Sequence, residues 1–405
     1  TDVLLRKMNK LFYCSFIFIF FFTSIHCLQS QEVSFLFMGD IMGHGPQIKS
    51  AFNKKEKKYD YSGVFYPLED VIYSVDYAVA NLEVTLAGPP YMGYPQFSSP
   101  DELAVGCKNV GIDVLVTANN HSCDRKNSGI IRTVNVLDSL KILHTGTFKD
   151  IKQREVRNLL ILNKNGIRIG LLNYTYGTNG IPFNTPAYVN ILDSSLIQND
   201  IISAKNKQLD KLIVFVHWGY EYRDFPNSYQ KNFNQYFYEL GVDVIIGSHP
   251  HVLQPMIYKH DNYQEFLTVY SLGNFVSNQR EVRKDGGAMF RLTFEKRGNH
   301  VFISRKEYIL TWVHKYLKNN QYNYEILPCA KKKYNENYFS NKEDYISMKT
   351  FLNNSRQHLN NNNLEIAEGI PFGYAKRLPI ELKQNKLPEL RKIKFSAKKK
   401  KKKWK

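Results

Sequence analysis

Cysteine is scarce in this 405-residue chain, which has five, and only Cys107, Cys123 and Cys329 lie beyond residue 30. An odd number of thiols argues against a disulfide framework, although one bridge among the three is an open alternative. Internal repeats are lacking as well. The fold therefore has to come from an ordinary hydrophobic core, for which a hydrophobic content of 43% is ample.

Long apolar runs are also lacking, except near the start, where residues 11–22 read LFYCSFIFIFFF after a few basic residues. This pattern with its polar exit is typical of a secretory signal peptide, so we predict a signal peptide or an N-terminal anchor over residues 1–30. The run is shorter than the roughly 20 apolar residues of a membrane span. An uncleaved anchor through Leu28 or lipidation at Cys27 are alternatives. Either way we expect an exported protein of the cell envelope, whether periplasmic, membrane-anchored or on the cell surface.

Acidic residues are in the minority, because 55 Lys and Arg face 37 Asp and Glu and give a net charge of +18. This excess favours an anionic partner, which can be a polymer, a lipid surface or a nucleic acid. Export argues against nucleic acid. The chain ends in SAKKKKKKWK, which is either a solvated tail or a segment that binds an anionic polymer.

Apolar runs alternate with amphipathic stretches up to about Lys315, which predicts one layered α/β domain over residues 31–315. Residues 316–405 are rich in Asn, Tyr and Lys, and we expect a partly helical extension there with a helix near residues 343–361. Strands are predicted at residues 33–40, 75–86, 112–121, 158–174 (a hairpin that turns at Asn165-Gly166), 211–219, 242–251, 266–275 and 288–296, and helices at 128–142 and 229–241. The last two strands are expected to complete the β content.

Polar side chains gather just past the carboxyl ends of these strands. They are Asp40, Asn81, Glu83, Asn120, His121, His217, His249, His251 and Asn274. In open α/β sheets this edge is where ligands bind. Two carboxylates, amides and several imidazoles at one edge predict a divalent metal site with mixed oxygen and nitrogen ligands. Pro250 stiffens the turn between His249 and His251, so that two imidazoles point in fixed directions.

The ordered motifs GD, NLE, ANNH, HWG, GSHPHV and SLGNF, which begin at Gly39, Asn81, Ala118, His217, Gly247 and Ser271, resemble those of the CapA family. These capsule-synthesis proteins are associated with poly-gamma-glutamate and are related to the calcineurin-like metallophosphoesterases. The resemblance covers residues 33–315. It implies a layered α/β/β/α metallophosphoesterase-like sandwich with a variable, Lys/Asn-rich C-terminal extension.

The resemblance also implies a role for each matching residue. Asp40 and His251 resemble ligands of a first metal, Glu83 a carboxylate that bridges two metals, Asn120, His217 and His249 ligands of the second metal, and His121 the catalytic acid that faces the leaving group. The implied cofactors are one or two divalent ions, which can be Mn, Zn, Fe or Mg. Two such ions can activate a shared water and clamp a transferring group.

Several positions keep two interpretations. Met42 stands where the phosphoesterases carry a histidine, so His44 is either a replacement ligand or an ordinary loop residue. Asn81 is predicted as a metal ligand or a residue behind one, and Asn274 as a residue behind one or a turn residue. Trp218 is predicted to bind substrate, with packing beneath the site as the alternative. The aromatic loop at residues 89–97 is either a lid over the site or a packing loop.

Two functions follow from the resemblance. The first is an exported, metal-dependent hydrolase or transferase of capsule synthesis that acts on an envelope polymer or a phosphate ester. The second is a non-enzymatic component that holds metal and polyanion during polyglutamate synthesis or export. In both, the expected partners are an anionic polymer such as polyglutamate and membrane-bound synthesis proteins, and no nucleic acid.

Overall fold

The computed structural model describes residues 31–260, 264–329 and 334–371. The predicted signal peptide or anchor and the terminal lysine run lie outside the described residues. No helix within these ranges is both long and apolar enough to cross a membrane. The three cysteines beyond residue 30 are all free and buried, so the open alternative of one bridge among them is not found.

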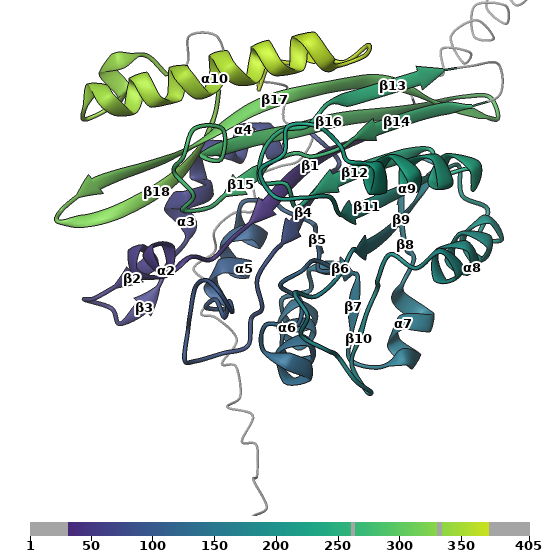
Figure 1. Cartoon of the computed structure of the whole chain (residues 1–405), viewed down its shortest axis with the longest axis horizontal. Helices are drawn as coiled ribbons and strands as arrows, with labels where there is room; N and C mark the ends of the chain where they lie inside the picture. Colours follow the sequence, from purple (N-terminus) through teal and green to yellow (C-terminus); the bar gives the residue numbers. More distant parts are fainter. Residues whose placement is uncertain (1–30, 261–263, 330–333, 372–405) are drawn as a thin grey trace, which may run out of the picture.

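Two β-sheets form the centre of the molecule (Figure 1). The first sheet runs in the order β18 (Gln321–Pro328), β17 (His300–Lys318), β16 (Gly286–Arg297), β1 (Gln31–Ile41), β4 (Tyr77–Leu82), β5 (Val114–Val116) and β6 (Leu143–Thr145), with β15 (Asn274–Val276) beside β1 and β19 (Ala367–Glu368) beside β17. The second runs in the order β13 (Met256–His260), β14 (Glu265–Val269), β12 (Val244–Ser248), β11 (Lys211–His217), β9 (Ile167–Thr175) and β8 (Leu160–Lys164).

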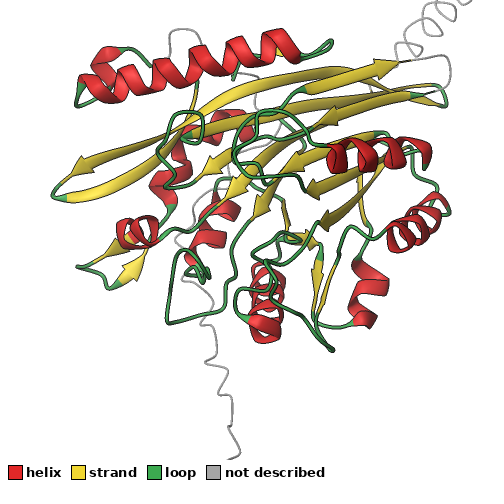
Figure 2. Cartoon of the chain, in the orientation of Figure 1, coloured by secondary structure: helices red, strands yellow, loops and turns green. Residues whose placement is uncertain are grey.

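Helices lie outside these sheets (Figure 2). They are α2 (Gly45–Ala51), α3 (Ser62–Phe65), α4 (Glu69–Ile72), α5 (Glu102–Asn109), α6 (Lys126–Leu140), α7 (Ile151–Arg157), α8 (Ser194–Lys205), α9 (Ser228–Glu239) and α10 (Lys342–Asn362). Short 3-10 turns η1 (Tyr66–Leu68) and η2 (Glu336–Tyr338) and the small pairs β2 (Phe52–Asn53) with β3 (Lys58–Tyr59) and β7 (Thr147–Phe148) with β10 (Tyr188–Val189) complete the described structure.

The layers follow from the side chains that each strand turns to its two faces. On β1, Phe35 and Phe37 pack in the core between the two sheets, together with Phe215 of β11. Leu36 and Met38, one residue out of phase, pack instead beneath α3, α5 and α6. The other face of the second sheet is covered by α8 and α9. The predicted α/β/β/α sandwich is therefore confirmed.

Parallel pairing brings the carboxyl ends of several strands to one place. β1 pairs in parallel with β4 and β15, and β11 with β9 and β12. The two sheets also join at this level, because Asn173 on β9 accepts hydrogen bonds from the backbone N–H groups of Thr117 and Ala118 at 3.1 and 2.7 Å. Loops that leave both sheets can therefore meet at a common site.

The C-terminal boundary was predicted wrongly. The division between residues 315 and 316 falls inside β17, which continues to Lys318 and pairs with β18 in the first sheet. The predicted helix is confirmed as α10, and its apolar side, including Phe351 and Leu352, packs in the core with Trp312 of β17. The first part of the supposed extension is thus an integral layer of the domain.

The β content also exceeds the prediction. β13, β17 and β18 were not predicted, and the expected strand at residues 266–275 is two strands in different sheets, β14 and β15. The chain crosses between the sheets over Ser271–Gly273. Gly273 adopts a positive φ of 67°, and a Cβ on Gly39 would lie 2.0 Å from the Gly273 carbonyl oxygen, so the crossing needs small residues on both sides.

Candidate metal centre

Six of the predicted residues converge where the two sheets meet. Two groups of three side chains each have their ligand atoms within 4.8 Å of one another, and both groups share one carboxylate. The first group is Asp40, Glu83 and His251, and the second is Glu83, His217 and His249. All five side chains are buried, and Asn120 joins the second group because its Oδ1 lies 2.9 Å from His217 Nε2.

Asp40 is held at the end of β1 by groups from both sheets. Asn81 on β4 donates to Asp40 Oδ1 at 2.7 Å, and the backbone N–H of His249 donates to Oδ2 at 3.3 Å. Asn119 donates in turn to the Asn81 side-chain oxygen at 3.2 Å. Asn81 therefore lies behind the carboxylate and fixes its orientation.

The turn between the paired histidines is bent more sharply than the sequence suggested. His249 and His251 have positive backbone φ angles of 99° and 57°, which residues other than glycine rarely adopt. Such conformations cost about 1–3 kcal/mol each and persist only where surrounding contacts enforce them. Here the N–H of Tyr222 donates to the Pro250 carbonyl at 2.8 Å and helps to hold the turn.

Two histidines of the cluster, His217 and His251, have polar neighbours that set their orientation. His217 Nδ1 lies 2.9 Å from Ser248 Oγ, which leaves Nε2 facing Asn120 and Glu83. His251 Nδ1 lies 3.0 Å from Asn274 Oδ1 and 3.3 Å from Asp40 Oδ2, and its Nε2 lies 3.9 Å from Glu83 Oε1.

Asn274 is itself fixed, because its amide nitrogen donates to Gln279 and to the Lys284 carbonyl at 2.9 and 2.8 Å. It therefore positions His251 rather than serving only as a turn residue. Hydrogen-bond partners of this kind are found behind most metal-ligating imidazoles.

Burial and charge set the protonation of the cluster. Burial and then the charge of Asp40 raise the pKa of Glu83 well above its usual range. Burial acts in the same sense on Asp40, but its hydrogen bond and charge interaction with His251 outweigh it and lower the pKa of Asp40. Burial, followed by neighbouring histidines, holds the pKa of His217 and of His249 well below the usual value, so both rings are neutral near pH 7.

The donor set fits a divalent cation. Both carboxylate oxygens of Glu83 and Nδ1 of His249 are buried without a hydrogen-bond partner. Orphaned buried polar atoms are rare in folded proteins and call for an explanation such as an ion. Neutral imidazole nitrogens and carboxylate oxygens are the donors that such ions take.

His121 lies beside the two groups and belongs to neither. Its Nδ1 is 2.8 Å from Asp124 Oδ2, which also accepts the N–H of Phe97 at 2.7 Å. The Phe97 ring meets the His121 ring edge-on at 4.6 Å. Nε2 is therefore the nitrogen that remains for a substrate. Sequence reasoning missed Asp124, although its place three residues after His121 was the available signal.

Two predicted positions lie away from the ligand atoms. His44 faces the same cavity as His251, but it belongs to neither group of three, and its Nδ1 lies 3.1 Å from Gln47 Oε1. Trp218 is fully buried, stacks on Tyr270 and donates its ring N–H to the Tyr270 carbonyl at 3.0 Å. The prediction that Trp218 binds substrate is wrong, because no part of the side chain reaches a surface, and packing beneath the site is its role.

A cavity of about 630 Å³ leads to the cluster, with His121 and His251 among its lining residues. Tyr94 of the aromatic loop lines it and is 74% exposed, whereas Phe97 at the end of that loop is buried against His121. The loop thus both packs on the site and contributes to its entrance. Tyr176, which the sequence did not point to, lies over His249 with ring centroids 4.6 Å apart.

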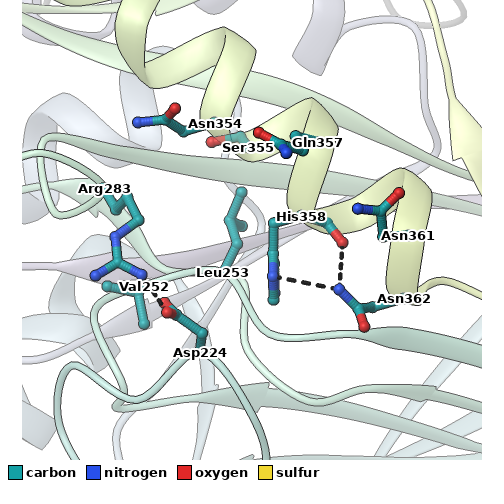
Figure 3. Close-up of a pocket in the computed structure, with 10 residues that line it drawn as sticks. All are labelled: Asp224, Val252, Leu253, Arg283, Asn354, Ser355, Gln357, His358, Asn361 and Asn362. Atoms are coloured by element: carbon teal, nitrogen blue, oxygen red, sulfur yellow. Dashed lines mark hydrogen bonds and ion pairs between the residues drawn. The ribbon is translucent and has the colours of Figure 1, made fainter.

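A second cavity, of about 310 Å³, lies between α10 and the residues that follow the histidine pair, Val252 and Leu253 (Figure 3). Its lining is rich in amides and includes His358, and Arg283 forms an ion pair with Asp224 at its edge. None of the predicted site residues lines this cavity.

Comparison with known proteins matches residues 34–279, more than half of the chain and including every predicted site residue, to the family described as "Bacterial capsule synthesis protein PGA_cap". The chain belongs to this family. The resemblance inferred from the sequence motifs is thereby confirmed. The PGA_cap match ends shortly after β15, so the long strands β16–β18 and α10 lie entirely beyond it.

Two Bacillus proteins are similar to this PGA_cap member. The capsule biosynthesis protein CapA of Bacillus anthracis is 26% identical over 284 residues, 67% of this chain and 66% of that protein. The PGA biosynthesis protein CapA of Bacillus subtilis (strain 168) is 28% identical over 279 residues, 66% of this chain and 69% of that protein. The alignment therefore spans just under two thirds of the Bacillus anthracis protein.

Among solved structures, Haemophilus influenzae NAD nucleotidase is similar with a TM-score of 0.45 and 12% identity, covering 80% of this chain and 56% of that one. The calcineurin-like phosphoesterase YfkN of Bacillus subtilis is similar with a TM-score of 0.40 and 13% identity, covering 81% of this chain and 98% of that one.

Proposed function

We propose that the protein is an exported component of capsule synthesis that binds one or two divalent cations and hydrolyses or transfers a bond in an anionic envelope polymer or a phosphate ester. The observation that carries the proposal is the convergence of two groups of ligands on the shared carboxylate of Glu83. Family membership supports the capsule role, and the names of the Bacillus relatives favour polyglutamate as the polymer. Nucleic acid has no part in this proposal.

The residues of the cluster would divide the work by position. Asp40, Glu83 and His251 would hold one cation, and His217, His249 and Asn120 would complete the other with Glu83. When bound, such cations act as Lewis acids on a phosphoryl or carbonyl oxygen. Their identity among Mn, Zn, Fe and Mg is left to metal analysis.

His121 would act on the proton of the leaving group. Asp124 engages Nδ1, which leaves Nε2 as the nitrogen that can pass a proton to the leaving oxygen as the scissile bond breaks. In hydrolysis the hydroxyl of water stays with the phosphoryl or acyl group, and its proton restores the ring. Burial of His121 against Phe97 keeps the ring in one orientation through this cycle.

Turnover by metal-loaded protein tests the proposal. Protein loaded with Mn²⁺ or Zn²⁺ is given a generic phosphodiester and a gamma-glutamyl peptide, and turnover with at least one of them is expected. His121→Ala should abolish turnover while metal content is retained. His144→Ala is the matched control. His144 is also buried, but it lies outside the site, where its Nε2 is 3.2 Å from Asp138 Oδ1.

No turnover with any metal, in protein that still binds metal and polyglutamate, would favour the alternative role as a non-enzymatic binding component. In that case the membrane-bound synthesis proteins proposed as partners would carry the chemistry.

A further inference from the structure

Two cations lie close together beside the cavity that leads to the metal centre. Arg280, in the loop after β15, lines this cavity together with His121 and His251. Lys315 on β17 donates to the side-chain oxygen of Asn278, another lining residue, at 3.1 Å. Arg280 therefore faces the region through which a substrate reaches the cluster. Lys315 lies behind Asn278 at the edge of that region, with its ammonium group also over the Tyr322 ring.

Neither cation has an acidic partner. Within the described part of the chain, no carboxylate oxygen lies within 4.0 Å of a side-chain nitrogen of Arg280 or Lys315, the distance that defines an ion pair. Arg280 donates from Nη1 to the Val313 carbonyl at 2.8 Å, and its other N–H groups have no acceptor among the described residues. Burial lowers the pKa of both groups, and the charge of Arg280 lowers that of Lys315 further.

None of the nearby acids forms an ion pair with Arg280 or Lys315 among the described residues, and Glu221 and Glu281 line the cavity as well. Asp285, the first acid whose charge acts on Arg280, accepts the ring N–H of Trp312 at 2.7 Å. Glu281 is 68% exposed and lies 3.6 Å from Lys284. By contrast Arg283, only three residues from Arg280, has its own carboxylate partner in Asp224 (Figure 3). Two unpaired, partly desolvated cations attract an oxyanion strongly, because each charge-assisted hydrogen bond is about twice as strong as a neutral one.

We infer that Arg280 and Lys315 form an oxyanion-binding subsite that takes a substrate carboxylate while the neighbouring bond of the polymer lies at the metal centre. This inference rests on the proposed function, since it assumes a polyanionic substrate. The guanidinium offers several N–H donors to one carboxylate, and the ammonium adds a point charge beside it. Tyr94, exposed at the rim of the same cavity, can pack on the chain between successive carboxylates.

The test uses the full chain in EDTA, so that divalent metal ions play no part. Binding of a fluorescein-labelled oligomer of gamma-linked glutamate is followed by anisotropy. Arg280→Gln and Lys315→Gln should each weaken binding about tenfold or more, as expected for loss of a hydrogen bond between charged groups. Arg283→Gln, which makes the same change of charge nearby, should bind as the wild type does.

Wild-type binding by both site variants, or equal weakening by Arg283→Gln, would overturn the inference. So would displacement of the oligomer by inorganic phosphate but not by glutarate, because the subsite would then be a phosphate site. Arg280 packs on Trp312, so if Arg280→Gln fails to fold, the more peripheral Lys315→Gln carries the test alone. Failure here leaves turnover by metal-loaded protein untouched, and the two proposals are thereby separated.

Discussion

Replacement of Asn81 by alanine should weaken divalent-cation binding without unfolding the protein. Asn81 donates to Asp40 Oδ1 at 2.7 Å and lies 3.3 Å from His217 Nδ1, so it supports one ligand from each group. A hydrogen bond to a charged group contributes about 1.5–3 kcal/mol, which corresponds to about 10- to 150-fold in a dissociation constant. Residues behind metal ligands have effects of about 10- to 100-fold, so the two values agree.

Calorimetric titration of EDTA-treated protein with MnCl₂ measures the change. Asn190→Ala is the matched control, because Asn190 is also fully buried and accepts from Arg154 at 2.8 Å, but it lies outside the site. Both variants should lose about 1–3 kcal/mol of unfolding free energy in urea, since each leaves buried partners unpaired. Only Asn81→Ala should lose Mn²⁺ affinity. A wild-type dissociation constant for Asn81→Ala, or an equal loss for Asn190→Ala, would refute the reasoning.

Three further outcomes are expected. Asp124→Asn should lower kcat about 10- to 100-fold with unchanged Mn²⁺ content, because Nδ1 of His121 loses its carboxylate partner; a wild-type rate would contradict this. Burial lowers the pKa of His44 to about 4 from 6.5, so the unfolded chain binds a proton that the folded chain does not, and stability should rise as pH increases from 4 to 6.5. His44→Gln should remove up to about 3 kcal/mol of that rise in urea unfolding, and identical pH slopes would count against it. Trp218→Phe should lower the free energy of unfolding by about 1–3 kcal/mol and leave KM unchanged, whereas a raised KM would indicate that Trp218 contacts the substrate after all.

The ligands could be predicted because each one follows a strand whose apolar run is easily read. Residues 212–216 of β11 and 244–246 of β12 are continuous apolar stretches, as expected for parallel strands that are buried on both faces. Once such strands are recognised, the polar residues after them fall at one edge of the sheets. The order of the motifs along the chain then matched them to a known family.

The supporting residues could not be predicted, because their roles depend on the distance between segments far apart in the sequence. Arg280 and Lys315 lie near the same cavity only because β15 and β17 belong to one sheet. Asn274 orients His251 only because the chain crosses from the second sheet to the first at Gly273. Local pattern identifies a strand, but it does not give the sheet in which the strand lies.

The misplaced domain boundary has a similar cause. The Asn- and Tyr-rich composition after residue 315 obscured the second half of a long hairpin, whose strands β17 and β18 pair from Thr311 to Lys318. Composition changed within a strand because that end of the hairpin becomes exposed, as at Leu317 and Tyr322.

The most direct test of the metal centre is anomalous diffraction from a crystal soaked in Mn²⁺. One peak should lie within bonding distance of Glu83, His217 and His249, and a second within bonding distance of Glu83, Asp40 and His251. In crystals of Glu83→Gln both peaks should weaken together. Manganese bound only at other residues, or wild-type peaks in the Glu83→Gln crystal, would contradict a cluster organised around this one shared carboxylate.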